Sequence, residues 1–208
     1  PSIAQNAGIQ FESLAHPLLT NRQPIPNTFN AKKDAFFIIT GANMAGKSTF
    51  LRSVSLSIVM ANCGLPIYAS SVVYTPIKLI TSMRTEDSLA KDQSYFFSEL
   101  NRLKYIVEKL QVDRYFVVLD EILKGTNSDD KAEGSRQFVE KLVRTSAMGL
   151  VATHDLSLCV LSDTLDAVKN YHFDAQIKDD ELYFDYTLKE GVSKTKNASF
   201  LLKKMGIV

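Results

Sequence analysis

The residues with the clearest chemical meaning form one glycine-rich stretch, Gly41-Ala42-Asn43-Met44-Ala45-Gly46-Lys47-Ser48, which Thr49 follows. The stretch matches the pattern G-x-x-x-x-G-K-[ST], which is typical of loops that bind nucleotide phosphates. Glycines allow such a loop to curl so that successive backbone N–H groups point at phosphate oxygens. We expect Lys47 to reach the β- and γ-phosphates and the Ser48 hydroxyl to ligate Mg²⁺.

Two acidic residues, Asp120 and Glu121, follow the apolar run Phe116–Leu119. An aspartate at the carboxyl end of a buried strand can hold Mg²⁺ beside a phosphate loop, directly or through water. The glutamate after it is placed to orient or deprotonate an attacking water. Two acids after a strand often form only a polar turn, but with the phosphate loop they favour nucleotide hydrolysis over simple binding.

Four further residues have types that could take part in chemistry. His154 follows the apolar run 149–153, where it could sense a γ-phosphate and relay its loss, or simply lie in a surface loop. Ser94 begins an expected helix, and a serine there most often serves as a helix cap. Cys63 and Cys159 have no metal-ligand spacing, and we interpret both as packing residues.

These side chains must be positioned by strands and helices that alternate along the chain. Short apolar runs predict buried strands at 35–40, 115–119 and 149–153, with strand-like segments between 71 and 84. Helical spacing predicts helices from Lys47 to a stop at Gly64, over 94–110 and 130–145, and a short last one over 199–205. Segments 171–177 and 182–188 predict a hairpin. The sequence thus indicates an α/β fold with a mainly parallel central sheet, flanking helices and an antiparallel β-hairpin.

Composition and the absence of certain patterns limit the class of protein to which the chain can belong. The 208 residues include 24 Lys or Arg and 23 Asp or Glu, so the net charge of +1 gives no overall attraction for nucleic acid. No apolar run approaches a membrane span, and no signal peptide is visible, which together predict a soluble intracellular protein. Residues 1–34 are rich in turn signals and form an expected lead-in segment to a core over 35–208. Because the chain opens at Pro1, we expect a fragment of a longer protein.

Taken together, these motifs resemble the C-terminal ATPase domain of the MutS DNA mismatch repair family. Residues 40–49 resemble T-G-P-N-M-[GAS]-G-K-S-T, and residues 120–126 resemble D-E-[ILV]-G-[RK]-G-T. Residues 152–154 match A-T-H, and residues 94–99 resemble S-T-F-x-x-E. His16-Pro17 and the segment 24–27 resemble the family's lead-in near the adenine. The resemblance covers essentially the whole chain, in the right order.

The resemblance implies a P-loop NTPase of the ABC-type ATPase fold that works as a composite dimer. It implies that ATP is bound by the loop 41–49, with Ile25 and Asn27 on the adenine side and Mg²⁺ held by Ser48 and Asp120. Glu121 and His154 are implied at the γ-phosphate, and Ser94 is implied to reach the ATP of the other subunit. The expected partners are a second copy or a MutS-like subunit, and double-stranded DNA held by other domains. The expected location is the cytoplasm, at the nucleoid when on DNA, without a membrane.

Several residues depart from the family pattern. Ala42 replaces a proline, Leu123 replaces a glycine, and Pro24 stands where an adenine-stacking aromatic residue is expected. These departures suggest a diverged MutS-like protein. Two alternatives stay open: an ABC transporter or chromosome-maintenance ATPase, and a nucleotide-gated dimerisation module with little turnover. An ABC transporter or chromosome-maintenance ATPase is expected to carry a stretch like L-S-G-G-Q before Asp120, and this stretch is absent. For the dimerisation module, Glu121 argues against little turnover, whereas the altered stretch 91–95 argues for it.

Overall fold

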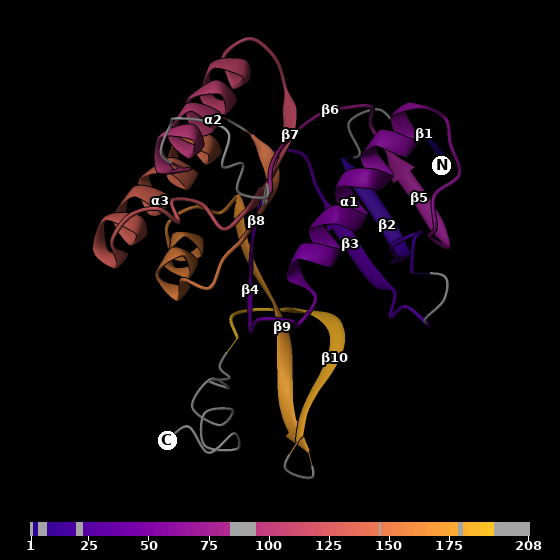
Figure 1. The fold of residues 1–208 in the computed structure, drawn as a ribbon. Coiled ribbons are helices and arrows are strands. Elements are labelled where there is room, and N and C mark those ends of the chain that lie inside the picture. The colour runs from indigo at the N-terminus through magenta and orange to yellow at the C-terminus, as the bar shows by residue number, and fades with distance from the viewer. Residues whose placement is uncertain are drawn as a thin grey trace.

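A computed structural model describes residues 2–3, 8–19, 23–83, 95–145, 147–178 and 181–193. In this part of the chain, two sheets are combined with three α-helices and one 3₁₀ helix (Figure 1). The elements are β1 (Ser2–Ile3), β2 (Ile9–Leu14), β3 (Asn27–Ala31), β4 (Phe36–Gly41), α1 (Lys47–Asn62), β5 (Ser71–Tyr74), β6 (Lys78–Ser82), α2 (Tyr95–Leu110), β7 (Tyr115–Asp120), α3 (Ser128–Arg144), β8 (Met148–Ala152), the 3₁₀ helix η1 (Leu156–Asp163), β9 (Val168–Lys178) and β10 (Glu181–Glu190). The expected mixed α/β architecture is confirmed.

The larger sheet has the strand order β10-β9-β4-β8-β7-β6. Its pairs are parallel except for β10, which runs antiparallel to β9 and forms the hairpin that extends from the body in Figure 1. Strand β8 is buried along its whole length, as expected for a parallel sheet covered on both faces. Because side chains alternate along a strand, Phe37 and Ile39 of β4 pack on the α1 side, whereas Phe36 and Ile38 pack toward α2 and α3.

A second sheet, in the order β1-β5-β2-β3, is built mostly from the lead-in segment 1–34, for which the sequence predicts turns and no strand is expected. Strands β2 and β3 are thus elements that the sequence prediction lacks. Burial alternates along β3, where Asn27, Phe29 and Ala31 are turned inward, but its polar residues leave too few apolar ones to signal a strand. Phe29 joins this sheet to the core, since its ring centroid lies 4.8 Å from that of Phe37 and 5.5 Å from that of Phe50.

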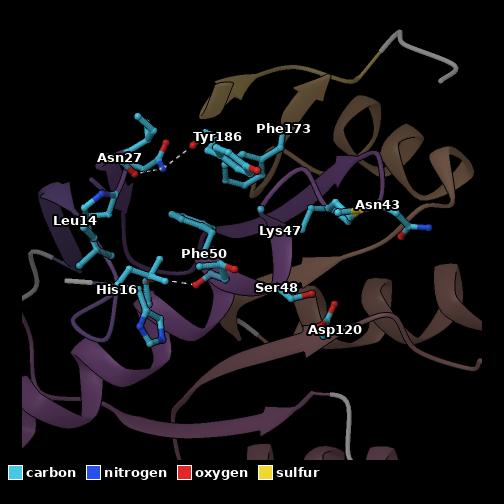
Figure 2. Close-up of a pocket in the computed structure, with 18 of the residues that line it drawn as sticks. Leu14, His16, Asn27, Asn43, Lys47, Ser48, Phe50, Asp120, Phe173 and Tyr186 are labelled. Atoms are coloured by element: carbon cyan, nitrogen blue, oxygen red, sulfur yellow. Dashed lines mark hydrogen bonds between the residues drawn. The ribbon is translucent and has the colours of Figure 1, made fainter. Parts of the chain in front are cut away.

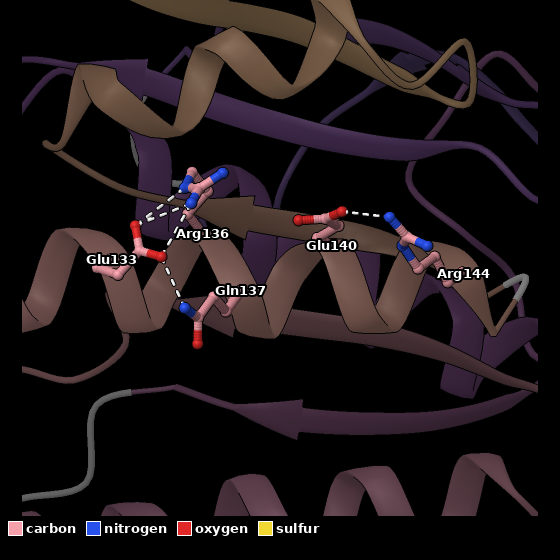
Figure 3. Close-up of polar contacts among 5 residues, drawn as sticks. All are labelled: Glu133, Arg136, Gln137, Glu140 and Arg144. Atoms are coloured by element: carbon pink, nitrogen blue, oxygen red, sulfur yellow. Dashed lines mark hydrogen bonds and ion pairs between the residues drawn. The ribbon is translucent and has the colours of Figure 1, made fainter.

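Helix α3 shows how local chemistry fixes the bounds of an element. The Asn127 side chain caps its first turn by accepting a hydrogen bond from the Asp130 N–H at 2.9 Å. Ion pairs one turn apart line its outer face, as Figure 3 shows for Glu133 with Arg136 and Glu140 with Arg144. Such solvent-screened pairs contribute little to stability, so the buried side of the helix does most of the anchoring.

The expectations for the two cysteines, the last helix and membrane spans have different outcomes in the structure. Cys159 is buried, and burial raises the pKa of its thiol to about 11, whereas Cys63 is exposed, so its predicted packing role is wrong. The short helix expected over 199–205 lies outside the described residues. None of the helices described is long and apolar enough to cross a membrane.

Candidate nucleotide-binding site

A cavity of about 660 Å³ lies where three neighbouring strands of the larger sheet end (Figure 2). Strand β4 leads into the glycine-rich loop, β7 ends at Asp120, and β8 is followed by His154. Carboxyl ends of parallel strands meet at one edge of a sheet, which is where such sheets usually bind ligands. The sequence-predicted residues that line the cavity are Ile25, Asn27, Asn43, Met44, Gly46, Lys47, Ser48, Thr49, Asp120, Glu121 and His154. Gly41, Ala42 and Ala45 complete the loop without lining it, and Ser94 lies outside the described residues.

The two glycines of the loop are required by its backbone. Gly41 has φ 135°, and a Cβ added there would lie 2.2 Å from the Phe173 carbonyl oxygen. Gly46 has φ 108° and precedes the first residue of α1, where no side chain caps the helix. The uncapped N-terminus of a 16-residue helix therefore borders the cavity, and its N–H groups and dipole favour an anion.

Lys47 is the buried cation of the site. The residue is only 5% exposed, and Nζ donates hydrogen bonds of 2.8 Å to the carbonyl oxygens of Gly41 and Ala42. Burial lowers the pKa of Lys47 to about 8, although the negative charges of Glu121 and Asp120 raise it. The ammonium is thus held at the cavity wall by the two loop carbonyls, and it lies 3.4 Å from His154 Nε2.

Glu121 lies between two nitrogen atoms. Its Oε1 is 2.8 Å from His154 Nε2, and its Oε2 is 3.0 Å from Lys124 Nζ. Burial raises the pKa of Glu121, but the hydrogen bond from Lys124 and the charges around it outweigh burial, so the pKa is lowered. Burial and the charge of Lys47 lower the pKa of His154. At neutral pH, Glu121 is therefore an ionised carboxylate next to a neutral imidazole, a pairing suited to holding or accepting a proton.

Ser48 and Asp120 place a hydroxyl and a carboxylate on the same side of the cavity. Asp120 is buried at the end of β7, and Figure 2 shows its side chain facing that of Ser48. Hydroxyl and carboxylate oxygens suit Mg²⁺, which usually takes one or two protein carboxylates and completes its shell with phosphates and water. In the described part of the chain, no group of three or more His, Cys, Asp or Glu residues could hold a metal by itself.

The far wall of the cavity contains residues that sequence reasoning missed. Tyr186 and Phe173 line it from the hairpin, and the Tyr186 ring packs close to Gly46. Strand β10 is irregular between Phe184 and Leu188, where Tyr186 has φ 52°. Asn27 holds this irregularity in place, because its Nδ2 donates to the Tyr186 carbonyl at 3.0 Å and its Oδ1 accepts from the Leu188 N–H at 2.6 Å. No sequence signal marks Tyr186, since an alternating strand pattern does not reveal a bulge.

Comparisons with known proteins place the chain in a family. The profile described as MutS domain V matches residues 37–204. The human protein named MutS protein homolog 4 is 32% identical over 193 residues, which cover 88% of this chain and 20% of that protein. The DNA mismatch repair protein MutS of Persephonella marina is 32% identical over 212 aligned positions, which cover all of this chain and 24% of that protein.

The chain thus spans about a fifth to a quarter of the length of these relatives. Its match to the domain profile covers most of its residues and includes the glycine-rich loop, Asp120, Glu121 and His154. With this match and the order of its motifs, the chain belongs to the MutS family, of which it carries domain V.

Proposed function

We propose that this chain is an Mg²⁺-dependent ATPase domain of the P-loop, ABC-type fold in a MutS-like mismatch repair protein. The observation that carries the proposal is the meeting of Lys47, Asp120, Glu121 and His154 around one cavity. These residues come from three separate strand ends, and each has a side chain suited to a different part of phosphoryl transfer. The family membership supports the same reading.

The cavity offers a defined place for each part of ATP. The phosphates fit the loop and the N-terminus of α1, where Lys47 exchanges its contacts with the loop carbonyls for phosphate oxygens. Ser48 and Asp120 hold Mg²⁺, which when bound neutralises charge on the phosphates. The adenine lies toward Ile25 and Tyr186, where an aromatic ring borders the cavity although position 24 is a proline.

Hydrolysis needs a group that orients water in line with the γ-phosphate. The ionised Glu121 carboxylate has this role: one oxygen accepts a proton from water while the other stays with Lys124. In the free protein, the Nε2–H of neutral His154 donates a hydrogen bond to Glu121 Oε1, and we expect His154 to contact the γ-phosphate when ATP is present. Loss of the γ-phosphate then changes the contacts of His154. The change passes first to η1, because this helix begins two residues after His154.

The proposal extends to assembly, as in the family that the chain belongs to. Two ATPase domains close on ATP, and Ser94 of one completes the site of the other. Closure is passed to a DNA clamp made by other domains of the parent protein, so double-stranded DNA is bound outside these residues. The near-neutral net charge of the chain agrees with DNA binding by other domains of the parent protein.

The direct test is phosphate release from ATP by the purified chain, with and without Mg²⁺. We expect slow turnover that requires Mg²⁺ and saturates with ATP. A second candidate, a nucleotide-gated module with little turnover, is favoured by the fact that both Glu121 oxygens are already engaged. ATP binding without phosphate release would support that candidate, and absence of ATP binding would contradict both.

The lowered pKa of Lys47 predicts that ATP affinity depends on pH. Phosphate oxygens favour the protonated amine, so affinity is full well below pH 8 and is lost as the pH rises through the pKa of about 8. At pH 9, about one-tenth of Lys47 stays protonated in the free protein, so the dissociation constant should be about tenfold larger than at pH 7. Binding of a fluorescent ATP analogue at both pH values measures this, with circular dichroism as the folding control. Equal affinity at the two pH values would contradict the role of Lys47.

A further inference from the structure

Glu99 of α2 forms an unusual contact with the chain that follows Glu121. Its two carboxylate oxygens accept backbone hydrogen bonds from neighbouring residues, Oε1 from the Leu123 N–H at 2.7 Å and Oε2 from the Lys124 N–H at 3.0 Å. Charge-assisted bonds of this kind are roughly twice as strong as neutral ones. The contact therefore joins the first turns of α2 to the segment that contains the candidate catalytic carboxylate.

The segment that Glu99 holds has a backbone that its sequence does not favour. Glu121 has φ 52° and Leu123 has φ 56°, in the left-handed region that residues with a Cβ rarely adopt. Neither residue is a glycine, so the surrounding structure must stabilise this conformation. The carboxylate of Glu99 is suited to this because it satisfies the two successive N–H groups that the turn presents.

A second contact from the same helix supports the first. The chain passes so close to α2 at Gly125 that an added Cβ would lie 2.7 Å from the Phe96 Cβ. Ile122 and Leu123 are buried in one cluster with Leu103 and Ile106 of α2. Helix α2 thus contacts the turn through its carboxylate, an aromatic side chain and its apolar face. A shift of α2 must move the turn, and Lys124 of the turn is paired with Glu121 at 3.0 Å.

We propose that Glu99 is a positioning residue that couples helix α2 to Glu121. It fixes the backbone of Leu123 and Lys124, and thereby sets where the Lys124 ammonium holds the Glu121 carboxylate. A movement at the start of α2 then changes the orientation of Glu121 relative to the cavity. This inference rests on the proposed ATPase function, because it assigns Glu99 to the same site.

The first arm of the test requires no nucleotide. Glutamine has the shape of glutamate but carries an NH₂ donor in place of one carboxylate oxygen, so in Glu99→Gln one of the two N–H groups faces a donor and loses its present acceptor. We expect amide hydrogen exchange at Leu123 or Lys124 to become about tenfold faster, since a charge-assisted bond is lost. The matched control is Glu108→Gln on the same helix, where an exposed carboxylate pairs with Lys104 at 3.8 Å. Unchanged exchange at both amides in Glu99→Gln would overturn the inference.

The second arm measures turnover. Glu99→Gln is expected to lower kcat about tenfold and leave KM within twofold of the unaltered chain, because the phosphate loop is not touched. Its melting temperature should stay within a few degrees of that of Glu108→Gln, which separates positioning from general loss of folding. Full kcat in Glu99→Gln, or the same loss of kcat in Glu108→Gln, would contradict the coupling. If the unaltered chain lacks turnover, the proposed function fails, and the exchange arm alone still decides whether Glu99 holds the turn.

Discussion

Lys47→Ala is expected to weaken ATP binding at least about 100-fold and to remove turnover, because hydrogen bonds to charged groups contribute about 1.5–3 kcal/mol each and this ammonium has three donors. No other described side chain among the cavity-lining residues is a lysine or arginine, so no cation there can replace it. Titration with a fluorescent ATP analogue measures the loss. Arg52→Ala is the matched control, since Arg52 is an exposed cation on the same helix.

The same substitution should not destabilise the fold. The pKa of Lys47 is about 8 in the folded chain, whereas the ordinary lysine value of 10.5 applies to the unfolded chain, so folding disfavours the protonated amine. Stability of the unaltered chain therefore rises as pH increases from about 8 toward 10.5. Lys47→Ala lacks this rise and should melt at or above the temperature of the unaltered chain at pH 7. A much lower melting temperature, or nearly unchanged ATP affinity, would show that Lys47 serves the structure and not the ligand.

The parts of the site that could be predicted from sequence are those whose chemistry is local. The glycine-rich loop needs positive φ at Gly41 and Gly46 and a lysine after Gly46, and all three residues lie within the short stretch 41–47. Asp120 and His154 could be assigned to one sheet edge because each follows a buried apolar run. Parallel strands then bring together residues that are far apart along the chain, without a detailed structure.

The parts that could not be predicted depend on contacts between distant segments. Tyr186 reaches the cavity only because β10 is irregular there and Asn27, 159 residues away, bonds its carbonyl. The backbone of Leu123 is left-handed although the residue is not a glycine, and its side chain lies against Gly134 of α3, where a Cβ would approach it to 2.8 Å. Contacts from α2 and α3 stabilise this left-handed backbone at position 123, where the family pattern has glycine.

Glu121→Gln is expected to lower kcat by a factor of about 10²–10⁴, the usual contribution of a positioned general base, while ATP binding is retained. Glutamine keeps the shape of the side chain and can still accept a hydrogen bond from Lys124, but it cannot take a proton from water. Phosphate release under single-turnover conditions measures the loss. Glu140→Gln on the outer face of α3 is the control, because that carboxylate pairs only with an exposed arginine among the contacts drawn in Figure 3. Full turnover in Glu121→Gln would reject the assigned role.

The same variant tests assembly, because an ATP-bound site that cannot hydrolyse accumulates in the closed state. Sedimentation of Glu121→Gln with ATP and Mg²⁺ should show a dimer that disappears without nucleotide. Adding Ser94→Ala should return it to the monomer if Ser94 completes the ATP site of the other subunit. A chain that binds ATP and stays monomeric would mean that Ser94 makes no such contact here. Glu99 would then still couple α2 to Glu121, since that contact lies within one chain. Dimer formation and positioning of the Glu121 carboxylate are thus separable: Ser94→Ala tests the first, and Glu99→Gln tests the second.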